Sequence, residues 1–234
     1  MNRDAWFSKR QILARRVCIT GCIMLAAAVF LLGGCGPSVK AYVVDMRYLY
    51  SGPPDEPYGQ EKYTINVARF RDGRMTADKR TVGVVRAPWW DEAVPIVPKE
   101  RTPAEIVTDG ARAQLAKDGF SLSGPAPLWN QEPATLDKAW GRYVLGGTIE
   151  ELYLDGKNDP PFCFYDASVR LTFVLGNTET GMVKRFTVER EGFSTPATLS
   201  EDSLERLISS VLSRVIAEGL SEDRVRQALR DISP

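Results

Sequence analysis

The 234-residue chain contains no histidine. Without an imidazole it can form neither a Ser-His-Asp triad, nor a Cys-His nucleophile pair, nor a metal site with histidine ligands. The sequence also lacks CxxC pairs, phosphate-binding glycine-rich loops that end in Lys-Ser or Lys-Thr, and Gly-x-Ser-x-Gly turns. We therefore expect a protein that is not an enzyme and that has no catalytic residue, metal site or cofactor.

Paired carboxylates remain as candidates for chemistry, because two acids can hydrolyse a glycoside. Asp91-Glu92 and Glu150-Glu151 are such pairs. Neighbouring residues on a strand point to opposite faces, so Glu150 and Glu151 are expected to lie on a solvated edge and not to address one substrate. Residues 155–159 resemble a calcium loop but lack the later Glu and the flanking helices, which favours a turn. A carboxylate-dependent surface hydrolase is the less favoured alternative.

Long apolar segments are scarce as well. The longest covers residues 17–32, and its 16 residues fall short of the roughly 20 that a membrane-spanning helix needs. Five basic residues and one acid precede it, in the order typical of an export signal. It ends in Leu32-Gly33-Gly34-Cys35, which resembles the lipobox of bacterial lipoproteins.

The resemblance to a lipobox implies that the Cys35 thiol carries a diacylglyceryl group, that cleavage falls before it, and that the new amino group is often acylated. Two or three acyl chains would attach the protein stably to a membrane. An uncleaved membrane helix and an ordinary secretory signal remain alternatives. Among lipoproteins an Asp after the acylated Cys retains the protein at the inner membrane. Gly36 here resembles an outer-membrane address facing the periplasm, with the inner membrane or cell surface as alternatives.

Removal of residues 1–34 leaves 200 residues, a length that suits one domain. This part holds 25 of the 30 basic and 29 of the 30 acidic residues, a net charge of −4. A nucleic-acid surface would need a basic field, so we expect no nucleic-acid partner. Of the four cysteines, only Cys163 remains as a free thiol, and no internal disulfide can form. We expect Cys163 to be a small buried residue; an intermolecular bridge or a reactive thiol is the alternative.

Alternating apolar residues predict strands over residues 42–50, 63–67, 82–85, 143–154, 167–175 and 182–190. The turn residues at 176–181 make the last two an antiparallel hairpin. Gly146-Gly147 suggests a bulge or a close approach of backbones within the fourth strand.

Two main helices are predicted. Thr102-Pro103-Ala104-Glu105 forms a capping box that begins the first, which Gly119 ends before a short strand at residues 120–122. Ser200 begins the second, whose apolar stripe of seven residues ends before Gly219. A short further helix is expected over residues 221–231. The predicted fold is α+β, a single domain with a mainly antiparallel sheet packed by two main helices. Its parts are a signal peptide at 1–34, a lipid-anchored segment with one strand at 35–62, and the α+β periplasmic domain at 63–234.

The order of elements over residues 63–219 resembles YajG-type and ABC-transport auxiliary lipoproteins. The resemblance is carried by the early strand, the helix that ends in residues 115–120, the strand around residues 145–149, the hairpin and the terminal helix. Residues 42–50, the Trp-rich loop and the insert around residues 157–162 depart from the family pattern. The resemblance implies a non-catalytic binding or assembly subunit, auxiliary to an ABC-type transport system.

One segment has the composition of a contact surface. Trp89 and Trp90 lie between two prolines and outside any amphipathic period. Paired Trp side chains are common anchors at protein interfaces and at membrane headgroups, although they could instead cover one end of the core. The expected partners are the membrane, through the acyl chains on Cys35, and an envelope protein complex. A lipid carrier with an apolar cavity between the terminal helix and the sheet is the main alternative.

Overall fold

The structure is a computed structural model that describes residues 41–49, 63–88 and 92–233. Cys35, Trp89 and Trp90 lie outside the described residues, as does the predicted signal peptide. Within the described ranges, none of the helices has the length and apolar character needed to cross a membrane.

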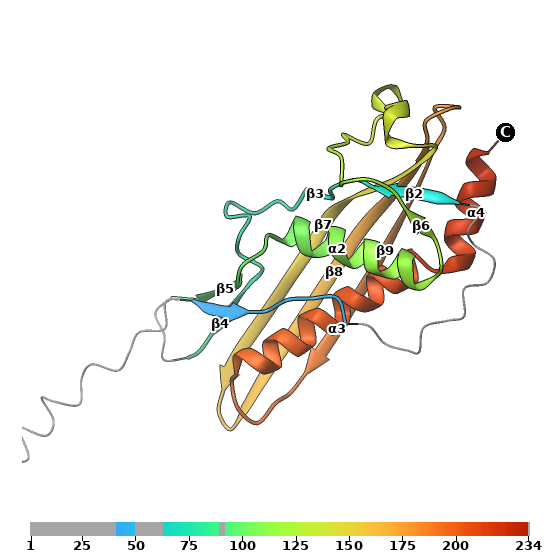
Figure 1. The fold of residues 1–234 in the computed structure, drawn as a ribbon. Helices are drawn as coiled ribbons and strands as arrows, with labels where there is room; N and C mark the ends of the chain where they lie inside the picture. Colours follow the sequence, from blue (N-terminus) through green and yellow to red (C-terminus); the bar gives the residue numbers. More distant parts are fainter. Residues whose placement is uncertain (1–40, 50–62, 89–91, 234) are drawn as a thin grey trace, which may run out of the picture. The chain divides into compact units, whose positions relative to one another are not determined.

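Three long strands form the centre of the sheet (Figure 1). They are β7 (Tyr143–Asp159), β8 (Phe162–Asn177) and β9 (Val183–Ser194), and each is antiparallel to the next. Over residues 148–159 and 162–172, alternating residues bury one face and leave the other solvated. At the other end of β7 and β8 both faces are buried, because Trp129 and Leu136 pack with Val144 and Val174 on the second face. The predicted hairpin is therefore confirmed as part of a longer antiparallel meander.

The edge of β7 that faces away from β8 pairs, one after another along its length, with three short parallel strands. These are β2 (Thr64–Val67), β3 (Arg71–Asp72) and β4 (Gly83–Arg86). Antiparallel to β4 lies β5 (Val94–Pro98), which is parallel to β1 (Tyr42–Val44); β6 (Ser121–Leu122) is parallel to β2. The described residues thus form one mixed, nine-stranded sheet, whose longest pairings are antiparallel. The predicted α+β class is confirmed, although β5 was not foreseen.

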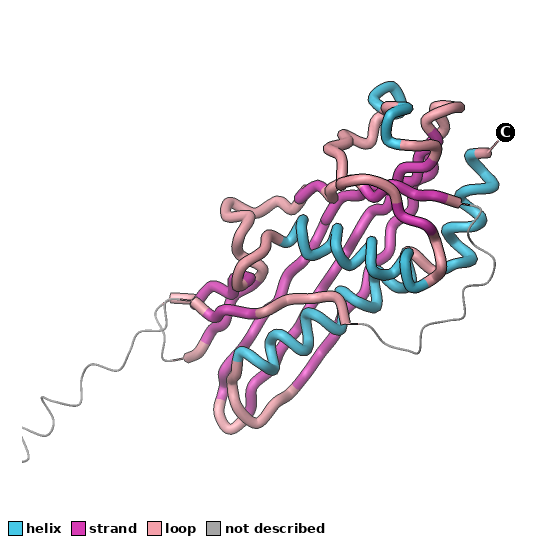
Figure 2. The backbone as a smooth tube through the Cα atoms, viewed as in Figure 1, coloured by secondary structure: helices cyan, strands magenta, loops and turns pink. Residues whose placement is uncertain are grey.

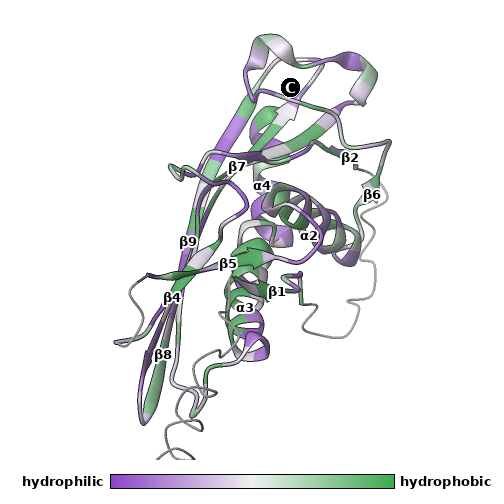
Figure 3. Cartoon of the chain, turned by 90° about the vertical axis from the view of Figure 1, so that its left-hand side faces the viewer, coloured by the Kyte–Doolittle hydropathy of each residue, from purple (hydrophilic) through white to green (hydrophobic). Residues whose placement is uncertain are grey.

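Three helices cover one face of the sheet (Figure 3): α2 (Pro103–Lys117), α3 (Glu201–Gly219) and α4 (Glu222–Ile232). The capping box of α2 is present, since Thr102 Oγ1 accepts from the Glu105 N–H at 3.3 Å and the Thr102 N–H donates to Glu105 Oε2 at 2.8 Å. The seven apolar residues of the predicted α3 stripe are all buried. These are the two main helices that the sequence predicts, with α4 as the short third.

The interface between α3 and the sheet is closely packed. A Cβ on Gly219 would lie 2.7 Å from Phe173 Cζ, and one on Gly192 would lie 2.5 Å from Val211 Cγ2. Both glycines are therefore positions where helix and strand approach each other directly. These contacts leave no space for an acyl chain between α3 and the strands β8 and β9 at these points, where the carrier alternative places its cavity.

The predicted strand over residues 42–50 is correct only for its first residues. From β1 onward the chain runs along α3, and side chains of that helix accept hydrogen bonds from its backbone N–H groups. The pairs are Val43 with Glu201 (2.8 Å), Asp45 with Glu205 (3.1 Å), Arg47 with Ser209 (3.2 Å) and Leu49 with Ser213 (2.7 Å). Two extended residues advance about 6.6 Å and four helical residues about 6.0 Å, so the two repeats stay in step. The period-2 alternation is real, but its partner over residues 45–49 is a helix.

Of two further expectations for β7, the turn is wrong, and the bulge or close approach at the glycines is confirmed as a close approach. Residues 155–159 belong to the strand and not to a turn, because Asp155 to Lys157 pair with β4 on one side and with β8 on the other. The turn comes later, at Pro160-Pro161. The register shift lies between Ile149 and Glu151, beyond the glycines, whereas Gly147 is a close approach: a Cβ there would lie 2.5 Å from the carbonyl oxygen of Thr172.

Candidate functional site

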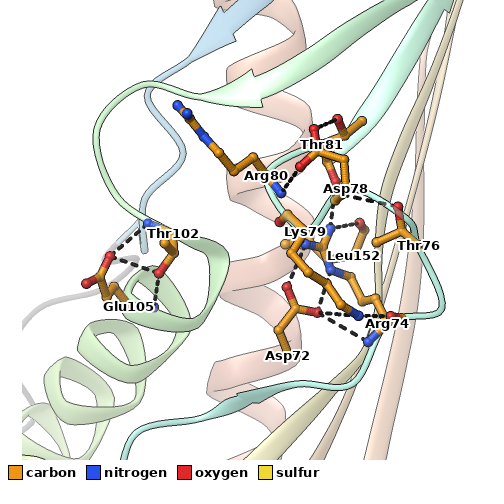
Figure 4. A network of polar contacts seen from close by, with 10 residues as sticks. All are labelled: Asp72, Arg74, Thr76, Asp78, Lys79, Arg80, Thr81, Thr102, Glu105 and Leu152. Carbon is orange, nitrogen blue, oxygen red and sulfur yellow. Dashed lines mark hydrogen bonds and ion pairs between the residues drawn. The ribbon is translucent and has the colours of Figure 1, made fainter.

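The sequence-predicted site residues Cys35, Trp89 and Trp90 all lie outside the described residues, so their roles remain predictions. Among the described residues, the most elaborate polar cluster lies in the loop that joins β3 to β4 (Figures 2 and 4). This loop borders a surface hollow next to β7, and the strands on either side of the loop pair with the same edge of β7.

Arg74 holds this loop together. Its side chain is only 6% exposed, and all five of its N–H groups donate. Nε and Nη2 bind the two carboxylate oxygens of Asp72 at 2.9 and 2.7 Å, and the remaining bonds reach the carbonyl oxygens of Lys79 (2.6 Å), Thr81 (2.9 Å) and Leu152 (3.2 Å). Because no donor is left over for a ligand, Arg74 joins the loop to β7 and does not form a binding group.

The acids of the loop are held ionised. Burial raises the pKa of Asp72, but the hydrogen bonds and positive charge of Arg74 outweigh that effect and leave the pKa below its ordinary value. Asp78 accepts from the Arg80 backbone N–H at 2.8 Å and from the Thr81 hydroxyl at 2.9 Å, and these bonds lower its pKa as well. A carboxyl group with a lowered pKa is a poor general acid at neutral pH. Neither group therefore suits acid catalysis.

The hollow beside this loop has a volume of about 510 Å³ and is lined by the loop and by residues 150–153. Glu150 is the extra residue at the β7 bulge, because Ile149 faces Leu171 and Glu151 already faces Arg170. Buried positions consequently change from odd to even numbers along the strand, and Glu150 and Glu151 both line the hollow. The expectation that these two acids point to opposite faces is wrong, since it assumed a regular strand.

This shared side does not make the two acids a catalytic pair. Glu151 accepts from the Ser168 hydroxyl and from Arg170 Nη2, the latter at 2.7 Å, while Arg170 Nη1 lies 3.6 Å from Glu189. Three strands thus carry a Glu-Arg-Glu row in which Glu151 is already paired. Among the described residues, no group of three or more Cys, Asp or Glu side chains is placed to hold a metal ion.

Aromatic side chains interrupt the polar face of the sheet near the β7–β8 turn. Phe162 is 56% exposed and Phe193 is 61% exposed, and the rings of Phe162 and Phe164 lie 6.4 Å apart between centroids. Phe162 and Phe164 occupy even-numbered positions of β8, which farther along the strand carry the polar residues of the solvated face. The sequence contained this signal, because an apolar residue in the polar register of a half-buried strand is expected to be exposed.

Cys163 points to the other face and is 3% exposed. Its thiol donates to Asn158 Oδ1 at 3.3 Å, and burial raises its pKa. The expectation of a small buried residue is confirmed. A thiol with a raised pKa holds little of the reactive thiolate, which disfavours the reactive-thiol alternative.

The chain matches no protein-family model and no curated protein. Solved structures with partial similarity include protein XCC0632 from Xanthomonas campestris, a member of DUF330 (12% identity, 82% of this chain and 99% of that one, TM-score 0.49). Lipoprotein GNA1162 from Neisseria meningitidis is 12% identical over 65% of this chain and 97% of its own, with a TM-score of 0.35. A minor lipoprotein from Acinetobacter baumannii is 12% identical over 70% and 94%, with a TM-score of 0.31. No site residue or activity is transferred from matches this distant.

Proposed function

We propose that this protein is a non-catalytic, lipid-anchored envelope protein that acts as a binding or assembly subunit. The observation that carries the proposal is the resemblance of Leu32-Gly33-Gly34-Cys35 to a lipobox at the end of an export signal. The described domain begins only six residues after Cys35. A short tether of this kind would keep the folded domain close to the membrane that holds the acyl chains.

The chemistry of the described domain supports binding over catalysis. No histidine is present in the chain, the buried thiol has a raised pKa, and Arg74 and Glu151 beside the hollow at β7 are already bonded to other residues. What the described surface offers is contact area: a solvated sheet face with exposed aromatic rings near one end. We propose Trp89 and Trp90 as the partner contact.

The location and the partner are further parts of the proposal. Gly36 in place of Asp after the acylated cysteine supports the outer membrane, with the domain facing the periplasm. The resemblance to auxiliary lipoproteins over residues 63–219 supports an envelope transport system of the ABC type as the complex that it serves.

Membrane fractionation tests the anchor. The unmodified protein should sediment with membranes, and Cys35→Ser should release it, because the acyl chains need the thiol. Unchanged attachment of Cys35→Ser would refute the lipoprotein assignment.

A crosslinked pull-down of the acylated protein from its own membranes, with proteins and lipids identified by mass spectrometry, tests the function. Recovery of transporter subunits that weakens in Trp89→Ala/Trp90→Ala would support the proposal. Leu128→Ala is the matched control, because Leu128 is an exposed apolar residue on a different loop. Stoichiometric lipid without protein partners would favour a carrier, and recovery of neither would reopen the hydrolase alternative.

A further inference from the structure

Three phenylalanines gather at one end of the sheet, of which Phe162 and Phe193 are exposed and Phe164 is half-buried. Phe162 and Phe164 lie at the start of β8, directly after the turn from β7, and Phe193 lies opposite Asp166 near the end of β9. All three project from the solvated face, away from the helices, because the buried residues of β8 have odd numbers and Phe193 pairs with an even one. We call these three side chains the Phe patch.

Such a patch needs an explanation. A phenylalanine that is more than half exposed forgoes most of the stabilisation that its burial would provide, and grouped exposed apolar side chains mark a surface that contacts something else. The nearby cations are paired, since Lys157 Nζ lies 3.0 Å from Asp159 Oδ2 and Arg86 is paired with Asp155. Asp166 and Glu191, on the same face, have no ion-pair partner among the described residues. An exposed apolar surface of this kind suits the boundary of an environment less polar than water.

The direction of the chain identifies that environment. Strand β1 is parallel to β5, which is antiparallel to β4, and β4 is parallel to β7. Because β7 runs toward its turn with β8, β1 runs away from that turn, and Tyr42, the first residue of β1, is the end of β1 nearer the turn. Tyr42 pairs with Ile96, Ile96 pairs with Gly83, and Gly83 pairs with Leu154, so Tyr42 lies at the level of Leu154 in the sheet.

The length of the tether limits where the lipid can be. Tyr42 follows Cys35 by seven positions, which corresponds to at most about 25 Å of extended chain. From the level of Leu154 to the end of β7 is five residues, or about 16 Å of strand. A lipid-anchored Cys35 can therefore reach the membrane at the Phe patch end, whereas the opposite end of the 17-residue strand is about 36 Å from that level.

We propose that the Phe patch docks on the lipid bilayer and holds the domain with the β7–β8 turn toward the membrane. The three rings lie at the level of the headgroups, where aromatic side chains are favoured. Asp166, which lies beside Phe193 across the strands, keeps the contact shallow, because a carboxylate is costly in the hydrocarbon region. This inference rests on the proposed lipid anchor for its direction, and it adds a specific orientation and a second membrane contact.

A thiol-accessibility experiment tests the docking. Phe193→Cys introduces one reactive thiol into the patch, and Met182→Cys introduces a control thiol at the other end of β9, where Met182 is 48% exposed. Acylation blocks Cys35, and Cys163 is buried with a raised pKa, so the new thiol dominates the signal. Each acylated full-length variant is reconstituted into vesicles of phosphatidylethanolamine and phosphatidylglycerol. It is then labelled with a charged maleimide, and the rate is compared with that of the corresponding protein made without residues 1–35, which carries no acyl chain, in solution.

On vesicles, the Phe193→Cys thiol should react several-fold more slowly than in solution, while the Met182→Cys rate should stay the same. Adding Phe162→Ser and Phe164→Ser to Phe193→Cys should restore the solution rate. Both substituted positions lie on the solvated face, and circular dichroism checks that the fold is retained. Equal rates at Phe193→Cys on vesicles and in solution would overturn the docking.

The outcomes also separate the two proposals. Protein that floats with the vesicles but shows no protection at Phe193→Cys is anchored without docking, so only this inference fails. Protein that does not float refutes the anchor and this inference with it. Protection that occurs in native membranes but not in pure-lipid vesicles would assign the patch to a protein partner and would overturn the lipid assignment.

Discussion

Replacement of Arg74 by Met tests whether the buried guanidinium stabilises the β3–β4 loop. Methionine keeps an unbranched apolar side chain in place of the arginine stem but removes five hydrogen bonds, and it leaves Asp72 with Lys79 Nζ, at 3.9 Å, as its nearest remaining cation. Breaking a buried ion pair from one side costs roughly 3–5 kcal/mol. Because Asp72 is 15% exposed, we expect the low end, about 3 kcal/mol.

Urea unfolding of the protein without its signal peptide measures this loss. With a slope near 2 kcal/mol per molar urea, the midpoint should fall by about 1.5 M. Arg80→Met is the matched control, since Arg80 is an exposed arginine of the same loop and its loss should change stability by less than about 0.5 kcal/mol. A loss below about 1 kcal/mol for Arg74→Met would refute the reasoning, because water or Lys79 would then be replacing the guanidinium.

The same pair gives a pH dependence. The pKa of Asp72 is lowered in the folded protein, so the stability that it contributes is present above the ordinary carboxyl pKa of about 3.9 and is lost as the pH falls through the folded-state pKa. Unfolding midpoints of the unmodified protein and of Asp72→Asn should therefore converge as the pH is lowered from about 5 to about 2.5. A difference that stays constant over this range would contradict the assignment of a lowered pKa to Asp72.

Three further predictions concern local packing. Gly147→Ala should destabilise by roughly 1–3 kcal/mol in urea unfolding, because the added Cβ would lie 2.5 Å from the Thr172 carbonyl oxygen. Thr102→Ala should cost about 1 kcal/mol, because it removes the hydroxyl that caps α2 through the Glu105 N–H. The Cys163 thiol should react with a disulfide reagent far more slowly in the folded protein than in urea, because burial raises its pKa.

Each of these has a control. Glu191→Ala, at an exposed strand position, should leave the unfolding midpoint nearly unchanged, and Thr102→Ser should retain most of the cap. Equal midpoints for Gly147→Ala and Glu191→Ala would mean that the backbones relax around the methyl group. Equal losses for Thr102→Ala and Thr102→Ser would show that the hydroxyl is not the stabilising group, and rapid labelling of folded Cys163 would disprove its burial.

The sequence by itself determined the features that depend on neighbouring residues. Period-2 alternation located the long strands, the capping box located the start of α2, and seven apolar residues at helical spacing located the buried face of α3. The expectation that Cys163 is a small buried residue also agrees with its burial in the structure. Such patterns are readable because a strand or helix repeats every few residues and must bury one face.

The tertiary structure alone decided which elements meet. Residues 45–49 keep the alternation of a strand but bind the side chains of α3, a partner about 160 positions away in the sequence. No local pattern marks Arg74 as buried, because the three carbonyl oxygens and the Asp72 carboxylate that surround it come together only in the folded chain. The extra residue Glu150 moved the buried positions of β7 from odd to even numbers, because β7 shifts its pairing with β8 by one residue there. Pairing over long separations depends on the whole core, so local patterns leave it open.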